Sequence, residues 1–147
     1  MRTSAASRGF KRAGVIAAAA LVPFAVVNNA WAGERESYIV QALPGFESQR
    51  WTDDGGTGVT KVEFTKCTVN NGYTTFSSTH VQLWEHIKAW PDEQRGSTRK
   101  YTACKTGTSV GEFPAMTKGD VSYFRISQIN GGTGVIHLDV SKVRVAH

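Results

Sequence analysis

The sequence predicts an all-β protein, an antiparallel β-sandwich of Greek-key-like type with about seven or eight strands. Short runs of Thr, Val, Tyr, Phe and Ser are separated by Gly, Asn, Asp or Pro, which is the composition of strands and turns. A basic, then apolar, leader occupies residues 1–32, and only two cysteines follow it. We therefore expect a secretory signal peptide over 1–32 and a single domain with one disulfide over 33–147.

The leader has the three parts of a signal peptide. Four basic residues lie in the first twelve positions, an apolar run extends from Ala13 to Val27, and Ala30-Trp31-Ala32 forms a small-residue cleavage site. The apolar run is shorter than the roughly 20 residues that a membrane-spanning helix needs. Its Ala- and Arg-rich style resembles the leaders of exported proteins of high-GC Gram-positive bacteria. We expect a secreted, extracellular protein without a stable membrane anchor after cleavage.

The net charge of +5 belongs mostly to this leader. Seventeen basic residues oppose twelve acidic ones, and four of the basic residues but none of the acidic ones lie before residue 33. The remaining chain is close to +1, which argues against nucleic acid as a partner because such binding depends on clustered positive charge. Export favours a disulfide between Cys67 and Cys104 over two free thiols. Its 37-residue separation would stabilise the fold by about 4 kcal/mol in the chain-entropy model.

Alternating apolar and polar residues locate the strands in chain order. The first expected strand has Tyr38, Val40 and Ala42 on one face, and a short strand follows the turn at Asn70-Asn71-Gly72. The strongest pattern lies between Gly119 and Ile129, where both faces are apolar as in a central strand. Outside residues 80–90, which are considered below, the expected strands are 37–43, 59–67, 73–77, 98–105, 119–129 and 134–147.

The last strand changes phase along its length. Leu138 and Val140 alternate with polar residues, but Val143 and Val145 fall on the opposite parity. One face can collect both pairs only if the strand contains an extra residue. We therefore expect a β-bulge near Ser141-Lys142, or a strand that crosses between the two sheets there.

The segment His80–Trp90 admits two interpretations. As a strand it turns Gln82, Trp84 and His86 outward, and as a helix it has an apolar stripe with a capping box at Thr79. The strand-rich surroundings favour the strand. The following segment 91–96 is rich in turn residues and should end it in either case.

The pentapeptide Gly-Gly-Thr-Gly-Val occurs twice, at 55–59 and at 131–135. Two similar hairpin turns explain this repeat more simply than duplication or phosphate binding, since strands rather than helices follow both copies.

Catalytic and metal motifs are weak in this sequence. His80 and His86 do not match the His-Glu-x-x-His spacing, and His147 is the last residue, where we expect mobility. Asp53-Asp54 fits turn chemistry and lacks the ligand ladder of a calcium loop. No catalytic residue, cofactor or metal is therefore assigned.

Aromatic residues are the better indication of function. Trp51 and Trp90 border loops, and Trp84 with His86 would form a polar-aromatic patch on the outer face of a strand. Flat aromatic rings beside hydrogen-bonding groups suit sugars or a protein partner. The tentative ligand-binding set is therefore Trp51, Trp84, His86 and Trp90. We expect a non-catalytic extracellular binding module for a polysaccharide or protein ligand. The alternatives are a secreted protease inhibitor or interaction protein, and thirdly a small secreted hydrolase.

Overall fold

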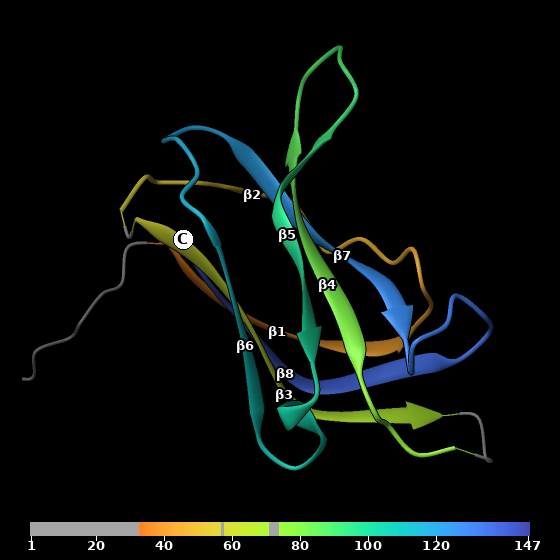
Figure 1. Ribbon diagram of the computed structural model, residues 1–147. Helices are drawn as coiled ribbons and strands as arrows, with labels where there is room; N and C mark the ends of the chain where they lie inside the picture. Colours follow the sequence, from red (N-terminus) through yellow and green to blue (C-terminus); the bar gives the residue numbers. More distant parts are fainter. Residues whose placement is uncertain (1–32, 57, 71–73) are drawn as a thin grey trace, which may run out of the picture.

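Two four-stranded antiparallel sheets make up the protein in the computed structural model, which describes residues 33–56, 58–70 and 74–147 (Figure 1). The first sheet has the order β1 (Glu34–Ala42), β8 (His137–Ala146), β3 (Val59–Asn70) and β6 (Thr108–Pro114). The second has the order β2 (Trp51–Thr52), β7 (Val121–Ile129), β4 (Thr79–His86) and β5 (Glu93–Tyr101). The expected all-β architecture of seven or eight strands is thus confirmed. The predicted leader, residues 1–32, lies outside the described residues.

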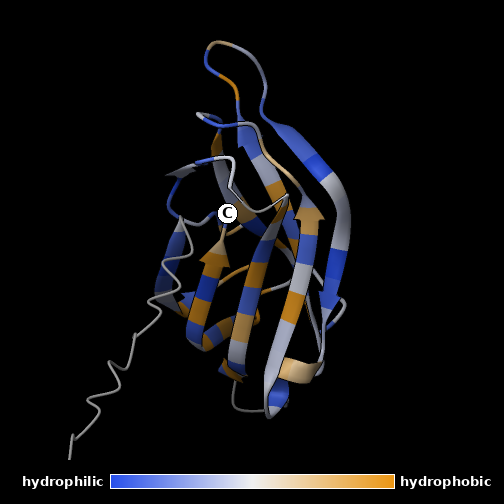
Figure 2. Ribbon diagram, turned by 90° about the vertical axis from the view of Figure 1, so that its left-hand side faces the viewer, coloured by the Kyte–Doolittle hydropathy of each residue, from blue (hydrophilic) through white to orange (hydrophobic). Residues whose placement is uncertain are grey.

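The core lies between the inner faces of the two sheets. Phe64 of β3 meets Phe124 of β7 with ring centres 5.4 Å apart, and it meets Tyr101 of β5 at 5.1 Å. Apolar and polar residues alternate along the strands, as the banding in Figure 2 shows. This alternation follows from the two-residue period of a strand, which turns successive side chains to opposite faces.

The chain passes repeatedly between the sheets. Among the described strands, only β4 and β5 are both consecutive and paired, and their hairpin projects beyond the sheets at the top of Figure 1. The two Gly-Gly-Thr-Gly-Val segments, at 55–59 and 131–135, join β2 to β3 and β7 to β8. Each therefore leads from one sheet to the other, and the expectation of two hairpin turns was wrong. Both copies precede a strand of the first sheet.

The predicted bulge in the last strand is confirmed. In the pairing of β1 with β8, Ser37 lies opposite Val143 but Ile39 lies opposite Val140, so β8 has one extra residue in this interval. Ser141 and Lys142 lie in this interval and are exposed. The apolar residues on either side are all buried, namely Leu138, Val140, Val143 and Val145. The extra residue therefore brings both apolar pairs to one face.

The neighbouring strands have matching irregularities. In β3 every second residue is buried as far as Phe64, but the next buried residue is Cys67, three positions later. Lys66, which lies between them, has φ of 55°. In β1, Gln41 has φ of 54°, and Ile39 and Ala42 are the buried residues. Tyr38 and Val40 are exposed, so the expected shared face of Tyr38, Val40 and Ala42 was wrong. Bulges in β1 and β8 displace the alternation, which a strict two-residue pattern cannot represent.

Several predicted strand boundaries also needed correction. Residues 74–77 are described and lie outside any strand, whereas Tyr73 is among the undescribed residues. The strand expected at 98–105 begins earlier, at Glu93, and gives way to the 3-10 turn η1 (Ala103–Lys105). The expected turn at 91–96 therefore belongs partly to β5. Strand β6 was missed because Ser109 and Gly111 occupy two of its buried positions while Val110 is exposed, and because it ends at a proline.

The segment His80–Trp90 is a strand as far as His86, and residues 87–92 form the hairpin turn. The predicted Cys67–Cys104 disulfide is present and joins β3 to η1. It links the first sheet to the chain just beyond β5 of the second. Within the described residues no helix is both long and apolar enough to cross a membrane.

Candidate functional site

The outer face of β4 carries the predicted polar-aromatic patch. Trp84 is half-buried there, its indole Nε1 donates to Oε1 of Gln82 at 3.2 Å, and the Arg125 guanidinium lies 5.8 Å from its ring centre. Gln82 in turn donates to the Thr98 hydroxyl of β5 at 3.0 Å. The strand period places Gln82, Trp84 and His86 on one face, so the sequence prediction of this face is correct.

Asp92 organises the end of this face that lies next to the β4–β5 hairpin turn. It accepts hydrogen bonds from the Tyr123 hydroxyl at 2.8 Å and from the Ile87 amide at 3.3 Å, and it pairs with Nδ1 of His86 at 2.9 Å. Arg50 lies 4.8 Å above the Tyr123 ring and 3.7 Å from the Asp92 carboxylate. These contacts hold the hairpin turn against β7. No sequence pattern predicts these contacts, because they join three segments that are far apart in the chain.

The same contacts shift two pKa values. The hydrogen bond from Tyr123 lowers the pKa of Asp92, with His86 and the Ile87 amide acting in the same direction. Burial, and secondly the hydrogen bond to Asp92, raise the pKa of Tyr123 to about 12. The His86–Asp92 pair has the composition of a general-base dyad. Among the described residues, no serine or threonine hydroxyl is hydrogen-bonded to the His86 ring.

The four predicted binding residues do not form one site. Trp90 lies on the projecting hairpin turn and is 75% exposed. Trp51 of β2 is only 4% exposed and points between the sheets, where its ring packs 5.9 Å from that of His147. Trp84 and His86 share the outer face of β4. Trp51 was expected in a loop, and it is instead buried because β2 pairs with β7 through Ser122.

A groove of about 680 Å³ opens on the side of the molecule where β1 faces the segment that precedes β2. Aromatic and apolar side chains line its inner part, and charged and polar groups of β1 and of residues 47–49 line its rim. Its volume lies in the range of small-molecule sites. The lining residues are Arg35, Glu36, Ser37, Tyr38, Ile39, Phe46, Glu47, Ser48, Gln49, Trp51, Phe124 and Val145.

Both walls of the groove are held in place. Ser48 donates its backbone N–H to the Phe124 carbonyl at 2.9 Å and accepts the Phe124 N–H on its hydroxyl at 3.0 Å. Arg35 of β1 donates to the Arg50 carbonyl at 3.2 Å, which bridges from one wall to the other. The groove is assembled from five separate segments of the chain. Only Trp51 of its lining residues was predicted as a ligand contact.

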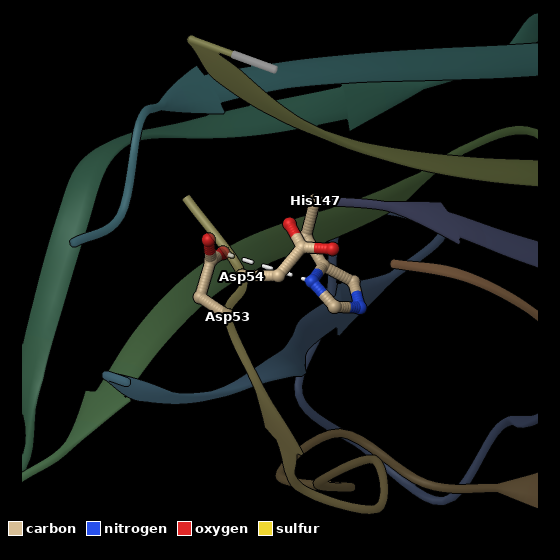
Figure 3. Close-up of side chains that lie close together, drawn as sticks. All are labelled: Asp53, Asp54 and His147. Atoms are coloured by element: carbon tan, nitrogen blue, oxygen red, sulfur yellow. Dashed lines mark ion pairs between the residues drawn. The ribbon is translucent and has the colours of Figure 1, made fainter. Parts of the chain in front are cut away.

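A second unpredicted cluster lies at the end of β8. Asp53, Asp54 and His147 converge, and Nδ1 of His147 lies 4.0 Å from Oδ2 of Asp53 (Figure 3). His147 is 5% exposed, so the expectation that it would be mobile was wrong. Burial lowers the pKa of His147 more than the nearby Asp53 and Asp54 carboxylates raise it. The sequence signal for this cluster, two adjacent aspartates and a distant histidine, is too common to identify it.

No protein-family model matches the chain, and no curated protein matches it significantly.

Proposed function

We propose that the protein is an exported, non-catalytic binding module that holds a segment of a polysaccharide in the groove between β1 and residues 46–51. The groove itself is the observation that supports this proposal. It offers about 680 Å³, which is enough for a few sugar units, and it combines aromatic surface with hydrogen-bonding groups.

The chemistry of the lining suits a sugar better than a purely apolar ligand. Sugar rings have apolar faces that pack on aromatic side chains and hydroxyl edges that need hydrogen-bond partners. The exposed Tyr38 and the half-buried Phe46 supply the accessible aromatic surface, while the buried Trp51 and Phe124 line the groove with little exposed area. The rim supplies the carboxylates of Glu36 and Glu47 and other donors and acceptors along β1 and residues 48–49.

Export is part of the same proposal. The leader over 1–32 has the order of a signal peptide, and the Cys67–Cys104 disulfide is most stable in an oxidising compartment. A Greek-key-like sandwich is the fold that we assign to the module, since the chain alternates between two packed antiparallel sheets. These features support an extracellular, bacterial binding protein.

Tryptophan fluorescence provides the test. In a Trp84→Phe/Trp90→Phe variant, Trp51 is the only tryptophan of residues 33–147, and its emission should change as an oligosaccharide enters the groove. The panel should contain fragments of chitin, cellulose, xylan, mannan and peptidoglycan, and calorimetry should give the affinity of any that responds. No response to any member of the panel would reject the sugar as ligand.

A matched pair of variants locates the binding site. Ser37→Phe places a ring in the groove and should weaken binding at least about tenfold, because a ligand cannot share that space. Ser141→Phe makes the same change at the exposed bulge of β8, outside the groove lining, and should leave the affinity unchanged. Binding that survives Ser37→Phe but is lost in Trp84→Ala would instead assign the ligand to the outer face of β4.

Trp90 supports a second candidate function, an interaction protein that contacts a protein partner through the β4–β5 hairpin. A tryptophan that is 75% exposed on a projecting turn has the position and size of an interface hot spot. Affinity capture with the wild-type protein and with Trp90→Ala tests this role. A partner retained equally by both proteins would exclude Trp90 as its anchor.

A further inference from the structure

We propose that Asp53, Asp54 and His147 form a binding site for one divalent cation, with Zn²⁺ as the ion that their chemistry fits best. This site is separate from the groove and does not depend on the proposed polysaccharide ligand. Carboxylate oxygens and imidazole nitrogens are both protein ligands of Zn²⁺, and a solvent molecule would complete four-coordination beside these three side chains.

The distances are close to those that an ion requires. One ligand atom from each of the three residues lies within 4.8 Å of the other two, and the Nδ1 to Oδ2 distance between His147 and Asp53 is 4.0 Å. Two ligands at about 2.1 Å from a tetrahedral ion are about 3.4 Å apart. Closing the His147–Asp53 pair onto an ion therefore needs a shift of only about 0.6 Å.

Two buried ligand atoms lack hydrogen-bond partners. Asp53 is 4% exposed and His147 is 5% exposed, and neither Oδ2 of Asp53 nor Nδ1 of His147 makes a hydrogen bond within the described part of the chain. The other oxygen of Asp53 accepts the Gly55 amide at 2.8 Å. One oxygen of the Asp53 carboxylate is thus hydrogen-bonded within its own loop, and the other oxygen faces the imidazole of His147. Buried polar atoms without partners are costly, and a cation between them would remove that cost.

The space beside these atoms matches a single ion. A cavity of about 10 Å³ lies against Asp53 and His147, and the remaining lining comes from Gly55, residues 58–60 and residues 115–116. That volume is close to the minimum that admits one water molecule. It is too small for an organic ligand, so the site can accept an ion or a single solvent molecule.

The aspartates are preorganised by their loop. The Asp53 amide donates to the Asp120 carbonyl at 2.8 Å, and the Asp53 carbonyl accepts the Gly119 amide at 2.8 Å. Asp54 accepts the Gly56 amide at 3.1 Å. From the other side, the His147 amide donates to the Gly33 carbonyl at 3.2 Å. An ion would therefore join the loop after β2 to the end of β8, two segments that the backbone already holds close.

The ligand types distinguish between cations. Ca²⁺ takes six to eight oxygen ligands and Mg²⁺ keeps several waters, whereas an imidazole favours zinc and later transition metals. The direct alternative is a hydrogen bond between His147 and Asp53 after a small closure, with no ion involved. Metal titration separates these two cases.

The test uses the protein freed of metal with a chelator and then titrated with Zn²⁺ alone. Calorimetry should show one Zn²⁺ per chain, thermal unfolding should shift to higher temperature, and Co²⁺ should give the visible absorption of an imidazole–carboxylate site. Trp51 emission should respond as well, because its ring lies 5.9 Å from that of His147. No Zn²⁺ binding, or binding of Ca²⁺ but not Zn²⁺, would overturn the proposal.

Isosteric variants assign the ligands. Asp53→Asn and Asp54→Asn keep the oxygens that accept the Gly55 and Gly56 amides but remove a negative charge. Each should weaken Zn²⁺ binding by more than about tenfold, the loss that even outer-shell changes cause. Asp120→Asn, in the adjoining turn, and His86→Gln, which removes the exposed His86–Asp92 pair, are the controls and should bind Zn²⁺ normally. Zn²⁺ binding lost in His86→Gln but kept in Asp53→Asn would overturn the assignment.

Discussion

Tyr101 of β5 fills the space that Gly111 leaves on β6, so the two sheets interlock at this edge. A Cβ atom on Gly111 would lie 2.3 Å from the Tyr101 hydroxyl oxygen and 2.8 Å from its ring. The same hydroxyl donates to the carbonyl of Val62, the residue that pairs with Gly111 across β3 and β6. The glycine is therefore required by a close approach between sheets.

Gly111→Ala should destabilise the protein by about 1 to 3 kcal/mol, the usual cost of overpacking a core. Urea unfolding measures this difference. In a double-mutant cycle, Tyr101→Phe/Gly111→Ala should be less destabilised than the sum of the two single variants, since the closest clash is with the removed hydroxyl. Additive effects would show that the hydroxyl contact is not the cause.

The buried tyrosines should make stability fall at high pH. The folded-state pKa of Tyr123 is raised from 10.0 to about 12. The pKa of Tyr101 is also raised, chiefly by burial. A raised pKa favours the neutral phenol in the folded state. The contribution of Tyr123 to the free energy of unfolding is therefore complete below pH 10 and is lost as the pH rises through 12.

Unfolding free energies measured between pH 9 and about 12 test this expectation. Tyr123→Phe should flatten the decline relative to wild type, while Tyr38→Phe, at an exposed position, should follow the wild-type curve. At neutral pH, Tyr123→Phe should lose about 1 kcal/mol with its hydrogen bond to Asp92. Equal slopes in wild type and Tyr123→Phe would contradict the raised pKa.

Removal of the disulfide should lower stability by about 2 to 4 kcal/mol. Cys67 and Cys104 are both buried and close a loop over 37 positions. The Cys67→Ala/Cys104→Ala variant avoids a free thiol, and its urea unfolding can be compared with that of reduced wild-type protein. Because the all-β core remains, we expect circular dichroism to show a folded protein in both samples at low urea. An unchanged unfolding midpoint would mean that the linkage adds no stability.

Lys66→Gly should stabilise the protein by up to about 1 kcal/mol. Lys66 is exposed at the bulge of β3 with φ of 55°, a conformation that is strained for any residue with a Cβ. Thr65→Gly is the control at the preceding strand position and should be destabilising by a similar amount. Thermal unfolding in both variants measures the difference. A loss of stability in Lys66→Gly would mean that the lysine side chain has a packing role.

The local pattern predicted those parts of the fold that depend on strand alternation alone. Val62 and Phe64 in β3 and the two-sided apolar strand β7 were located correctly. The phase change between Val140 and Val143 even predicted the bulge. Strand β6 was missed because small or polar residues occupy two of its three buried positions, and the exposed Tyr38 was missed because the bulges of β1 break the alternation.

The candidate sites also include features that local alternation predicts and features that it misses. The outward direction of Trp84 and His86 follows from one strand's own period, and the sequence was sufficient to predict it. The burial of Trp51 depends on its pairing with β7, and the nearness of Asp53 to His147 depends on which strands are neighbours. Such contacts are set by the packing of segments far apart in the chain, which no local pattern encodes.

By itself, the sequence determined the all-β class, the disulfide pair and the outer face of β4, since period, composition and two cysteines are local or countable properties. Only the tertiary structure determined the groove beside β1 and the cluster of Asp53, Asp54 and His147. Both are formed where the edges and ends of two sheets meet, and the order of strands in those sheets is a property of the whole core.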